Sequence, residues 1–419
     1  MLEEASGDVP PVPWSDALTR RHRALLKTTP FHARTSALMQ GNQWRRWAGH
    51  TVASAYELTP EREYLAIRNA CVVIDVSPLF KYHVRGADAH RFLNRLVTRD
   101  LSKMAVGQLT YTPWCNSRGK VVDDGTIARL SDTLFRLTAA ESNYRWLHEN
   151  AAGYDVQIED VSDELGALAL QGPRSRALLE RLSGADLSGV KYHRFTHVEL
   201  AGASTMVSRT GYTGDLGYEI WIPKDRALAV WDALVEAGQS YGLQASGIWA
   251  MDVARIEAGL VMLDVDYTPA PKAFTDAQAS SPYELGLGWA VHLDKGNFVG
   301  KKALQEEKQR GSPLWLVGLE IDHVAFGHAH DRLGLTTPYP FTPWRGVVPV
   351  HQGRDQVGYA TCGTWSPTLK KYIALAQVAP AVAATGSTLS IDLMVDRARL
   401  PFTATVTPIP FFNPERKRA

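Results

Sequence analysis

The most restrictive feature of this sequence is a change near residue 312, which divides the chain into two regions with different secondary-structure patterns. Beyond it, short β-type runs alternate with glycine and proline, at residues 314–321, 345–351, 356–361 and 389–393. Such a pattern predicts a small, separate β-barrel or β-sandwich. The 419 residues also exceed what one ordinary core can hold, so we expect two or three domains.

The region before residue 312 mixes helical and strand patterns. Apolar residues recur at helical spacing over four segments, residues 61–70, 88–96, 226–241 and 248–258. Strand patterns occupy four others, residues 72–75, 81–84, 120–130 and 217–222. Strands and helices alternate without long parallel runs, which predicts an α+β fold. The Pro-rich, charged residues 1–27 indicate an N-terminal arm with one short helix, and residues 264–283 indicate a loop.

Composition and charge exclude several classes of function. The formal net charge is +1, so nothing in the overall charge points to nucleic acid or to a membrane surface. The N-terminus lacks the pattern of a signal peptide, and no run of about 18 apolar residues exists, so we expect a cytoplasmic protein. Cys71, Cys115 and Cys362 are far apart and form no CxxC pair. We therefore expect no metal, no iron–sulfur cluster and no disulfide framework.

The first chemically informative segment is a tight turn followed by a strand with two adjacent carboxylates. Residues 116–119, Asn-Ser-Arg-Gly, turn the chain, and Asp123 and Asp124 follow on the strand. Side chains alternate along a strand, so one aspartate faces inward and the other outward. An inward carboxylate could orient a ring N–H or stabilise a cation formed during a reaction. On spacing alone, hydrogen bonding of the aspartates to the hairpin turn explains the pair better.

The second segment, residues 208–220, is rich in glycine and aromatic residues. Gly211, Gly214 and Gly217 follow a G-x-x-G-x-x-G spacing before a strand, unlike the G-x-G-x-x-G of dinucleotide-binding folds. Glycine allows a backbone to approach a flat ligand closely. Glu219 lies on the strand, where a carboxylate could accept two parallel N–H bonds from an aminopyrimidine edge. A surface glutamate beside a turn explains this residue equally well.

Taken together, these segments resemble the glycine-cleavage T-protein (aminomethyltransferase) family. Residues 208–220 look like the signature segment of that family, and residues 116–124 resemble its Asn–Gly–Asp-Asp hairpin. Further motifs follow in register, at residues 255–259, 281–289, 298–301, 363–371 and 410–412. The resemblance runs from about residue 29 to residue 414, and the order of its motifs is its main support.

The resemblance implies an α+β cloverleaf of three domains around a central opening that holds tetrahydrofolate as co-substrate, with no metal. Residues 28–310 would form two interleaved folate-binding domains, approximately 28–80 with 165–245 and 81–164 with 246–310. Residues 311–419 would form the C-terminal β-barrel or jelly-roll-like domain. Asp123 would match the catalytic aspartate and Glu219 the glutamate that anchors the pterin. Three further residues complete the expected folate site, namely Tyr212, Trp221 and Arg255.

Departures from the family pattern indicate a different one-carbon donor. Met251 stands where the family's helix motif has arginine, and the expected Phe-Ala-Gly-Trp is Trp47-Ala48-Gly49-His50. These changes resemble the branch that demethylates small molecules such as vanillate, syringate and dicamba. We therefore predict methyl transfer from a methoxy-aromatic substrate to N5 of tetrahydrofolate, which gives 5-methyltetrahydrofolate and a phenol. Flat apolar walls suit that substrate, and we expect them from Trp47, His50, Tyr56 and Trp114, although core packing explains these aromatic residues nearly as well.

In this hypothesis N5 attacks the methyl carbon and phenolate leaves. Asp123 would stabilise the positive charge that grows on N5, so replacing it with Asn should lower turnover with little effect on folding. A phenolate needs a proton or a hydrogen bond, which His50 or Tyr212 could supply. The expected catalytic residues are therefore Asp123, Tyr212 and His50.

Several alternatives use the same fold. One is the aminomethyltransferase of the glycine cleavage system itself, although Met251 and His50 argue against it, and another is a demethylase of dimethylsulfoniopropionate or of a methylated amine. A non-catalytic folate-binding relative is disfavoured, because residues 295–302 have neither the Cys nor the Gln-Glu of that group's motif. No docking surface for a lipoyl carrier is visible in the sequence, so we expect small-molecule partners and no carrier protein.

Overall fold

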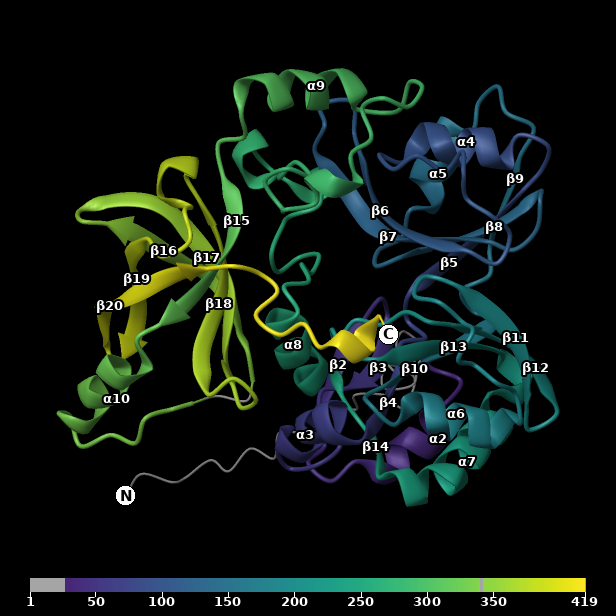
Figure 1. The fold of residues 1–419 in the computed structure, drawn as a ribbon, viewed down its shortest axis with the longest axis horizontal. Coiled ribbons are helices and arrows are strands. Elements are labelled where there is room, and N and C mark those ends of the chain that lie inside the picture. Colours follow the sequence, from purple (N-terminus) through teal and green to yellow (C-terminus); the bar gives the residue numbers. More distant parts are fainter. Residues whose placement is uncertain (1–26, 340–341, 419) are drawn as a thin grey trace, which may run out of the picture.

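The computed structural model describes residues 27–339 and 342–418, so nearly all of the predicted N-terminal arm, with its helix, lies outside the described residues. Three lobes surround a central region (Figure 1). One lobe is built on a six-stranded sheet, one on a five-stranded sheet and one on a closed barrel. The predicted α+β class with a C-terminal β-barrel is therefore confirmed.

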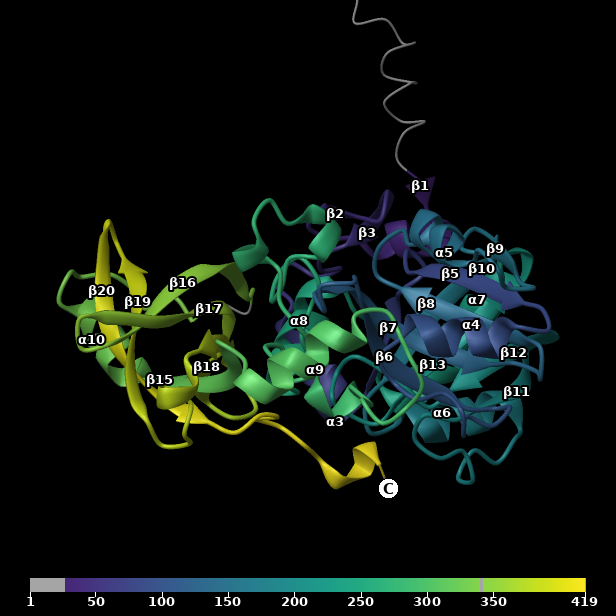
Figure 2. The same ribbon diagram turned by 90° about the horizontal axis from the view of Figure 1, so that it is seen from above.

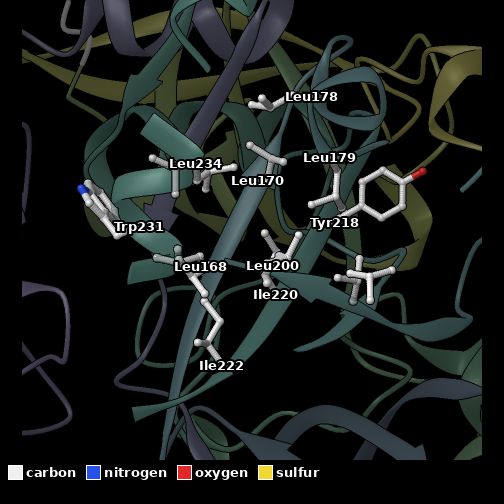
Figure 3. Packing of buried hydrophobic residues seen from close by; sticks show 14 of the residues in the cluster. Leu168, Leu170, Leu178, Leu179, Leu200, Tyr218, Ile220, Ile222, Trp231 and Leu234 are labelled. Carbon is white, nitrogen blue, oxygen red and sulfur yellow. The ribbon is translucent and has the colours of Figure 1, made fainter. Parts of the chain in front are cut away.

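The six-stranded sheet has the order β11-β12-β13-β10-β4-β14, and only its β4–β14 pair is parallel within the described chain. Its strands are, in that order, Phe195–Leu200, Ala203–Ser208, Gly217–Pro223, Leu165–Gln171, Cys71–Asp75 and Leu243–Ala245. Helices α6 (Ser175–Ser183) and α7 (Ala227–Gly238) cover one face, where Leu168, Leu170 and Ile220 pack beneath them (Figure 3). Because side chains alternate along a strand, Glu219 and Trp221 project from the other face, toward the centre of the molecule.

The five-stranded sheet is antiparallel, in the order β6-β7-β8-β5-β9. Its strands are Leu109–Cys115, Val121–Arg129, Leu134–Ala139, Phe80–Arg85 and Gln157–Asp160. Helices α4 (Ala89–Leu96) and α5 (Tyr144–Asn150) pack on one face and bury Phe92, Leu93, Trp114 and Leu147. The opposite face of this sheet turns toward the centre of the molecule, like that of the six-stranded sheet (Figures 1 and 2).

The C-terminal lobe is a closed barrel of order β15-β18-β17-β16-β19-β20. Its strands are Trp315–Ile321, Lys371–Val378, Asp355–Ser366, Trp344–Gln352, Thr388–Val395 and Ala398–Thr407. Pairing of β15 with β20 closes the barrel and leaves neither strand with a free edge. Helix α10 (His323–Asp331) packs on the barrel through Phe326, and helix α9 (Lys301–Arg310) precedes it in the chain.

Helix α8 (Ile248–Glu257) lies between the six-stranded sheet and the barrel. Nine of its ten residues are buried, as expected for a helix that is surrounded by other elements. Helix α3 (Glu61–Asn69) packs beside it, and a small sheet of β1 (Lys27–Thr28), β2 (Trp44–Trp47) and β3 (His50–Ala53) lies nearby. Short helix α2 (His32–Thr35) follows β1.

A C-terminal strap, residues 408–418, leaves β20 and returns to the six-stranded lobe (Figures 1 and 2). The Phe412 N–H donates to the Glu257 carbonyl at 2.8 Å, and Arg416 binds Asp215 through two bonds of 2.7 and 2.8 Å. The buried Arg68 guanidinium binds Glu257 and Asp215 and stacks 4.3 Å from the centre of the Phe412 ring. The strap therefore connects α3, α8 and the turn before β13, which carry Arg68, Glu257 and Asp215, to the barrel.

We propose domain boundaries close to those expected from the sequence. The strands of the five-stranded sheet all fall within residues 80–160, and those of the barrel fall within residues 315–407. The six-stranded sheet takes one strand from residues 71–75 and the others from residues 165–245, so the chain leaves this lobe and comes back.

Candidate functional site

A cavity of about 610 Å³ lies where the inner faces of the two large sheets meet β2, α8 and the barrel. Each of the two large sheets contributes one carboxylate to the cavity wall. Asp124 comes from β7 of the five-stranded sheet, and Glu219 comes from β13 of the six-stranded sheet. Aromatic side chains form much of the remaining wall, namely Trp47, Tyr111, Tyr192, Tyr212, Trp221 and Trp289. A flat, polar ligand of two or three rings suits a cavity of this size and composition.

Glu219 occupies the end of the cavity that the six-stranded sheet forms. Its carboxylate accepts a hydrogen bond of 2.6 Å from the Thr210 hydroxyl, and burial raises its pKa. Trp221 lies two residues further along the same face of the strand, and the Arg136 guanidinium stacks 4.2 Å from the centre of the Trp221 ring. Thr210 uses one donor on one carboxylate oxygen, so the carboxylate keeps lone pairs for N–H groups of a ligand.

The glycines of the glycine-rich turn pack tightly within the protein, and Gly211 also lines the cavity, so the close approach of its backbone to a ligand stays a prediction. A Cβ added to Gly211 or Gly217 would overlap the Gln171 side chain, at 1.9 and 2.4 Å. Gly214 has φ +72°, and a Cβ there would lie 2.4 Å from the Cβ of Ala258. Gln171 in turn donates to the carbonyls of Thr210 and Tyr218 at 3.2 and 3.3 Å. The turn is thus held against β10 and α8, which positions the strand that carries Glu219.

The paired aspartates point to opposite faces of the five-stranded sheet. Asp123 lies directly opposite Trp114 in the β6–β7 register, so both face the helices that cover this sheet. Asp123 is fully buried there and accepts bonds from the Asp124 N–H (2.7 Å), the Glu141 N–H (3.1 Å) and Asn143 Nδ2 (2.7 Å). Asp124 faces the cavity instead. The structure therefore puts the predicted catalytic residue, Asp123, behind the sheet, and its neighbour at the ligand site.

Two tyrosine hydroxyls hold Asp124 in place. Tyr111 donates to Oδ2 at 2.8 Å, and Tyr267 donates to Oδ1. Burial raises the pKa of Asp124, and burial together with the nearby Asp124 charge raises the pKa of both tyrosines, which therefore remain donors. Burial, followed by the charge of Asp124, also raises the pKa of Asp123 to about 8. Asp124 is thus an oriented carboxylate with free lone pairs and a raised affinity for a proton.

Tyr212 and Trp221 line the cavity, whereas Arg255 does not. The Tyr212 hydroxyl donates to the Val261 carbonyl, which holds its ring in place. The Trp221 indole N–H donates to the Ser208 hydroxyl at 3.3 Å. Arg255 is fully buried below the cavity, where it binds Asp252 at 2.7 Å and Asp266 at 2.5 Å. Arg255 therefore forms buried ion pairs near α8 and does not contact the cavity.

The predicted donor-binding aromatic cluster is dispersed in the structure. Trp47 lines the cavity. His50 pairs with it on strand β3 but is not among the cavity residues, and its Nδ1 lies 3.1 Å from the Ala48 carbonyl oxygen. Burial lowers the pKa of His50. Tyr56 lies at a separate hollow of about 10 Å³, and Trp114 is buried in the core of the five-stranded lobe, where its N–H donates to Asn143 at 3.0 Å. His50, Tyr56 and Trp114 are therefore not cavity residues.

Sequence reasoning missed much of the cavity wall. Tyr111 comes from a segment that carries no motif, and Trp289 ends the motif segment 281–289 but was assigned no role. Arg45 and Arg345 lie far apart in the chain. Strand alternation offered one usable signal, because Tyr111 and Asp124 lie on the same face of the β6–β7 hairpin. The other residues meet only through tertiary packing.

The described residues contain no helix that is long and apolar enough to cross a membrane. In the same part of the chain, no three His, Cys, Asp or Glu side chains are grouped so that they could hold a metal ion. All three cysteines are buried and free.

Comparison with known proteins accounts for most of the chain. Residues 31–295 match the family described as "GCVT N-terminal domain", and residues 332–413 match "Glycine cleavage T-protein C-terminal barrel domain". An aminomethyltransferase of Caldanaerobacter subterraneus subsp. tengcongensis is 38% identical over 334 residues, which are 78% of this chain and 82% of that protein. One from Halothermothrix orenii is 34% identical over 353 residues, 83% of this chain and 90% of that protein.

Among solved structures, the glycine cleavage system aminomethyltransferase T from Bartonella henselae superposes with a TM-score of 0.78 at 26% identity, covering 93% of this chain and 98% of that one. The predicted enzyme class, a tetrahydrofolate-dependent one-carbon transferase, is confirmed by these matches. The expectation that no carrier protein takes part is wrong, because the relatives are aminomethyltransferases and the solved structure belongs to the glycine cleavage system. The chain therefore belongs to the glycine-cleavage T-protein family.

Proposed function

We propose that this protein transfers the aminomethyl carbon of a lipoyl carrier protein to tetrahydrofolate, as the aminomethyltransferase of a glycine cleavage system. The observation that carries the proposal is Asp124, a half-buried carboxylate that two tyrosine hydroxyls aim into the same cavity as Glu219. Membership of a family whose matched relatives are named aminomethyltransferase supports the same reaction.

Glu219 would anchor the pterin. An aminopyrimidine edge offers two parallel N–H donors, and an ionised carboxylate accepts such a pair in one plane. The Thr210 hydroxyl and the packed glycine turn fix the orientation of Glu219, so little side-chain entropy is lost on binding. The aromatic walls at Trp221 and Tyr212 would cover the flat ring.

The reaction exchanges two bonds at one carbon. N5 and N10 of tetrahydrofolate each form a bond to the aminomethyl carbon, whose bonds to nitrogen and to the carrier's sulfur break. One N–H proton leaves with ammonia and the other with the sulfur, which becomes a thiol, so atoms and electrons balance. Asp124 would stabilise the positive charge on the attacking nitrogen and then hold its proton for the leaving group.

A reconstituted reaction tests the proposal. Purified protein would be mixed with tetrahydrofolate, glycine, its decarboxylase and the lipoylated carrier, and ammonia and methylenetetrahydrofolate would be quantified. We expect both products to require the carrier. Absence of both products in the complete mixture, with an authentic aminomethyltransferase active in parallel, would refute the proposed function.

The second candidate is methyl transfer from a small donor, the methoxy-aromatic substrate above all. Its support is Met251, which lines the cavity at a position where the family motif has arginine, beside the flat wall of Trp47. The same protein incubated with tetrahydrofolate and methoxybenzoates, dimethylsulfoniopropionate or dimethylglycine distinguishes the candidates. Carrier-independent 5-methyltetrahydrofolate would favour demethylation.

A further inference from the structure

Cationic side chains gather on the wall of the cavity that β2 and the barrel form. Arg45 and Arg46 come from β2, and Arg345 comes from β16. The carboxylates that line the cavity lie elsewhere, on β7, on β13 and in the segments around Glu141 and Asp264. The charged groups of the cavity are therefore separated, with the arginines on one side.

Among the described residues, Arg45 has no ion-pair partner of its own near α8, because the nearby Asp252 already binds two other arginines. The Asp252 carboxylate accepts from Arg255 on Oδ1 at 2.7 Å and from Arg345 on Oδ2 at 2.8 Å. Asp266 binds Arg255 in addition. Two carboxylates thus neutralise two arginines, and Arg45 is the third cation. Burial and the neighbouring Arg345 charge lower the pKa of Arg45, and the Asp252 charge offsets only part of that shift.

The Arg45 side chain also has an unused donor. Within the described residues, its Nη1 is buried and has no hydrogen-bond partner. A buried guanidinium nitrogen without an acceptor costs free energy, and an anion that accepts two of its N–H groups would remove that cost. Met251 and Trp47 border the same wall and add apolar surface without further charge.

Resting on the proposed folate cavity, we propose that Arg45, with Arg345 beside it, forms a carboxylate-binding subsite for a small-molecule ligand of the reaction. The carboxylate belongs either to the glutamate tail of the folate or to the small donor of the second candidate reaction. A guanidinium binds a carboxylate through two parallel bonds, so the subsite orients its ligand as well as attracting it. An uncharged aryl ether gains nothing from this subsite, whereas a carboxylated donor does.

Binding measurements on Arg45→Gln test the subsite. The probes are tetrahydrofolate, 6-methyltetrahydropterin, which lacks the tail, and dimethylglycine added to folate-saturated protein, each by anaerobic calorimetry. We expect R45Q to bind tetrahydrofolate or dimethylglycine about ten- to a hundredfold more weakly, as is typical for loss of a charge-assisted pair. Arg45→Lys should restore part of the loss, and Arg85→Gln, at an exposed arginine that ends β5, should match wild type.

Each outcome distinguishes a different case. A loss with tetrahydrofolate alone identifies the folate tail as the ligand, and a loss with dimethylglycine alone identifies the donor. Equal binding of every probe by R45Q and wild type overturns the subsite, as does an equal loss with 6-methyltetrahydropterin. If wild type binds neither pterin, the proposed function itself fails.

Discussion

Exchanging each of the adjacent aspartates for asparagine gives a sharp test of the site. Asp124 faces the cavity between two tyrosine hydroxyls, and either hydroxyl can turn to accept from the new amide. The fold of D124N should therefore lose less than about 1 kcal/mol of unfolding free energy. Loss of a positioned acid–base group lowers turnover about 10²- to 10⁴-fold. We expect kcat of D124N to fall by at least the lower figure.

The same exchange at Asp123 should have the opposite outcome. Three N–H groups converge on its two oxygens, so the NH₂ of an asparagine must oppose at least one of them. One orphaned buried donor costs about 1–3 kcal/mol. Asp123 lies behind the sheet, away from the cavity, so turnover of D123N should stay within a few-fold of wild type.

The assays are single-turnover transfer to tetrahydrofolate under saturating carrier, and urea unfolding followed by tryptophan fluorescence. The two variants differ by one position and carry the same Asp-to-Asn exchange, so each controls the other. A D123N protein that is slower than D124N, with unchanged stability, would refute the assignment of the two faces.

Three further predictions concern other charged groups. Burial raises the pKa of Glu219, and only the ionised carboxylate accepts two N–H bonds from a pterin. Folate affinity should therefore weaken as the pH falls through that raised pKa. Fluorescence titrations from pH 8 to 5 should show this decrease in affinity in wild type and none in E219Q. Burial, with the nearby Arg99 charge, lowers the pKa of His193 to about 4, so the unfolded chain binds the proton more readily and about 3 kcal/mol of stability is lost between pH 6.5 and 4. Urea unfolding of H193Q should show a smaller loss over that window, and an identical loss would contradict the reasoning. Arg68→Met strands the buried Glu257 and should cost about 3–5 kcal/mol in the same assay, whereas Arg62→Met, at an exposed pair with Glu57, should cost about 1 kcal/mol or less.

Local pattern predicted the elements whose periodicity is strong. Helices α3, α4, α7 and α8 begin within one residue of the predicted positions, and only the end of α7 differs by three residues. Strand β18 was missed because it is buried on both faces and reads as a continuous apolar run. Helix α10 was missed because Gly327 and polar residues interrupt its pattern, and Phe326 supplies its anchor to the barrel.

The sequence could not predict those features of the site that depend on tertiary packing. Alternation required that Asp123 and Asp124 face opposite ways, but the face that meets the cavity depends on which side α4 and α5 cover. The family motif predicted that Glu219 and Tyr212 lie at one site, and both line the cavity, because the strand and the turn that hold them are contiguous in sequence. His50 pairs directly with Trp47 in the β2–β3 hairpin, yet only Trp47 lines the cavity, so local pairing does not decide which of the two reaches it.

The C-terminal strap has a consequence for how the molecule is made. Residues 408–418 are translated after every helix and strand that they join, yet Arg416 and Phe412 complete the surroundings of Arg68 and Asp215. A nascent chain that has already formed both large sheets therefore still carries this buried charge cluster with part of its cover missing. Assembly of the three lobes is therefore completed only after the strap, which follows them in the chain, has been made.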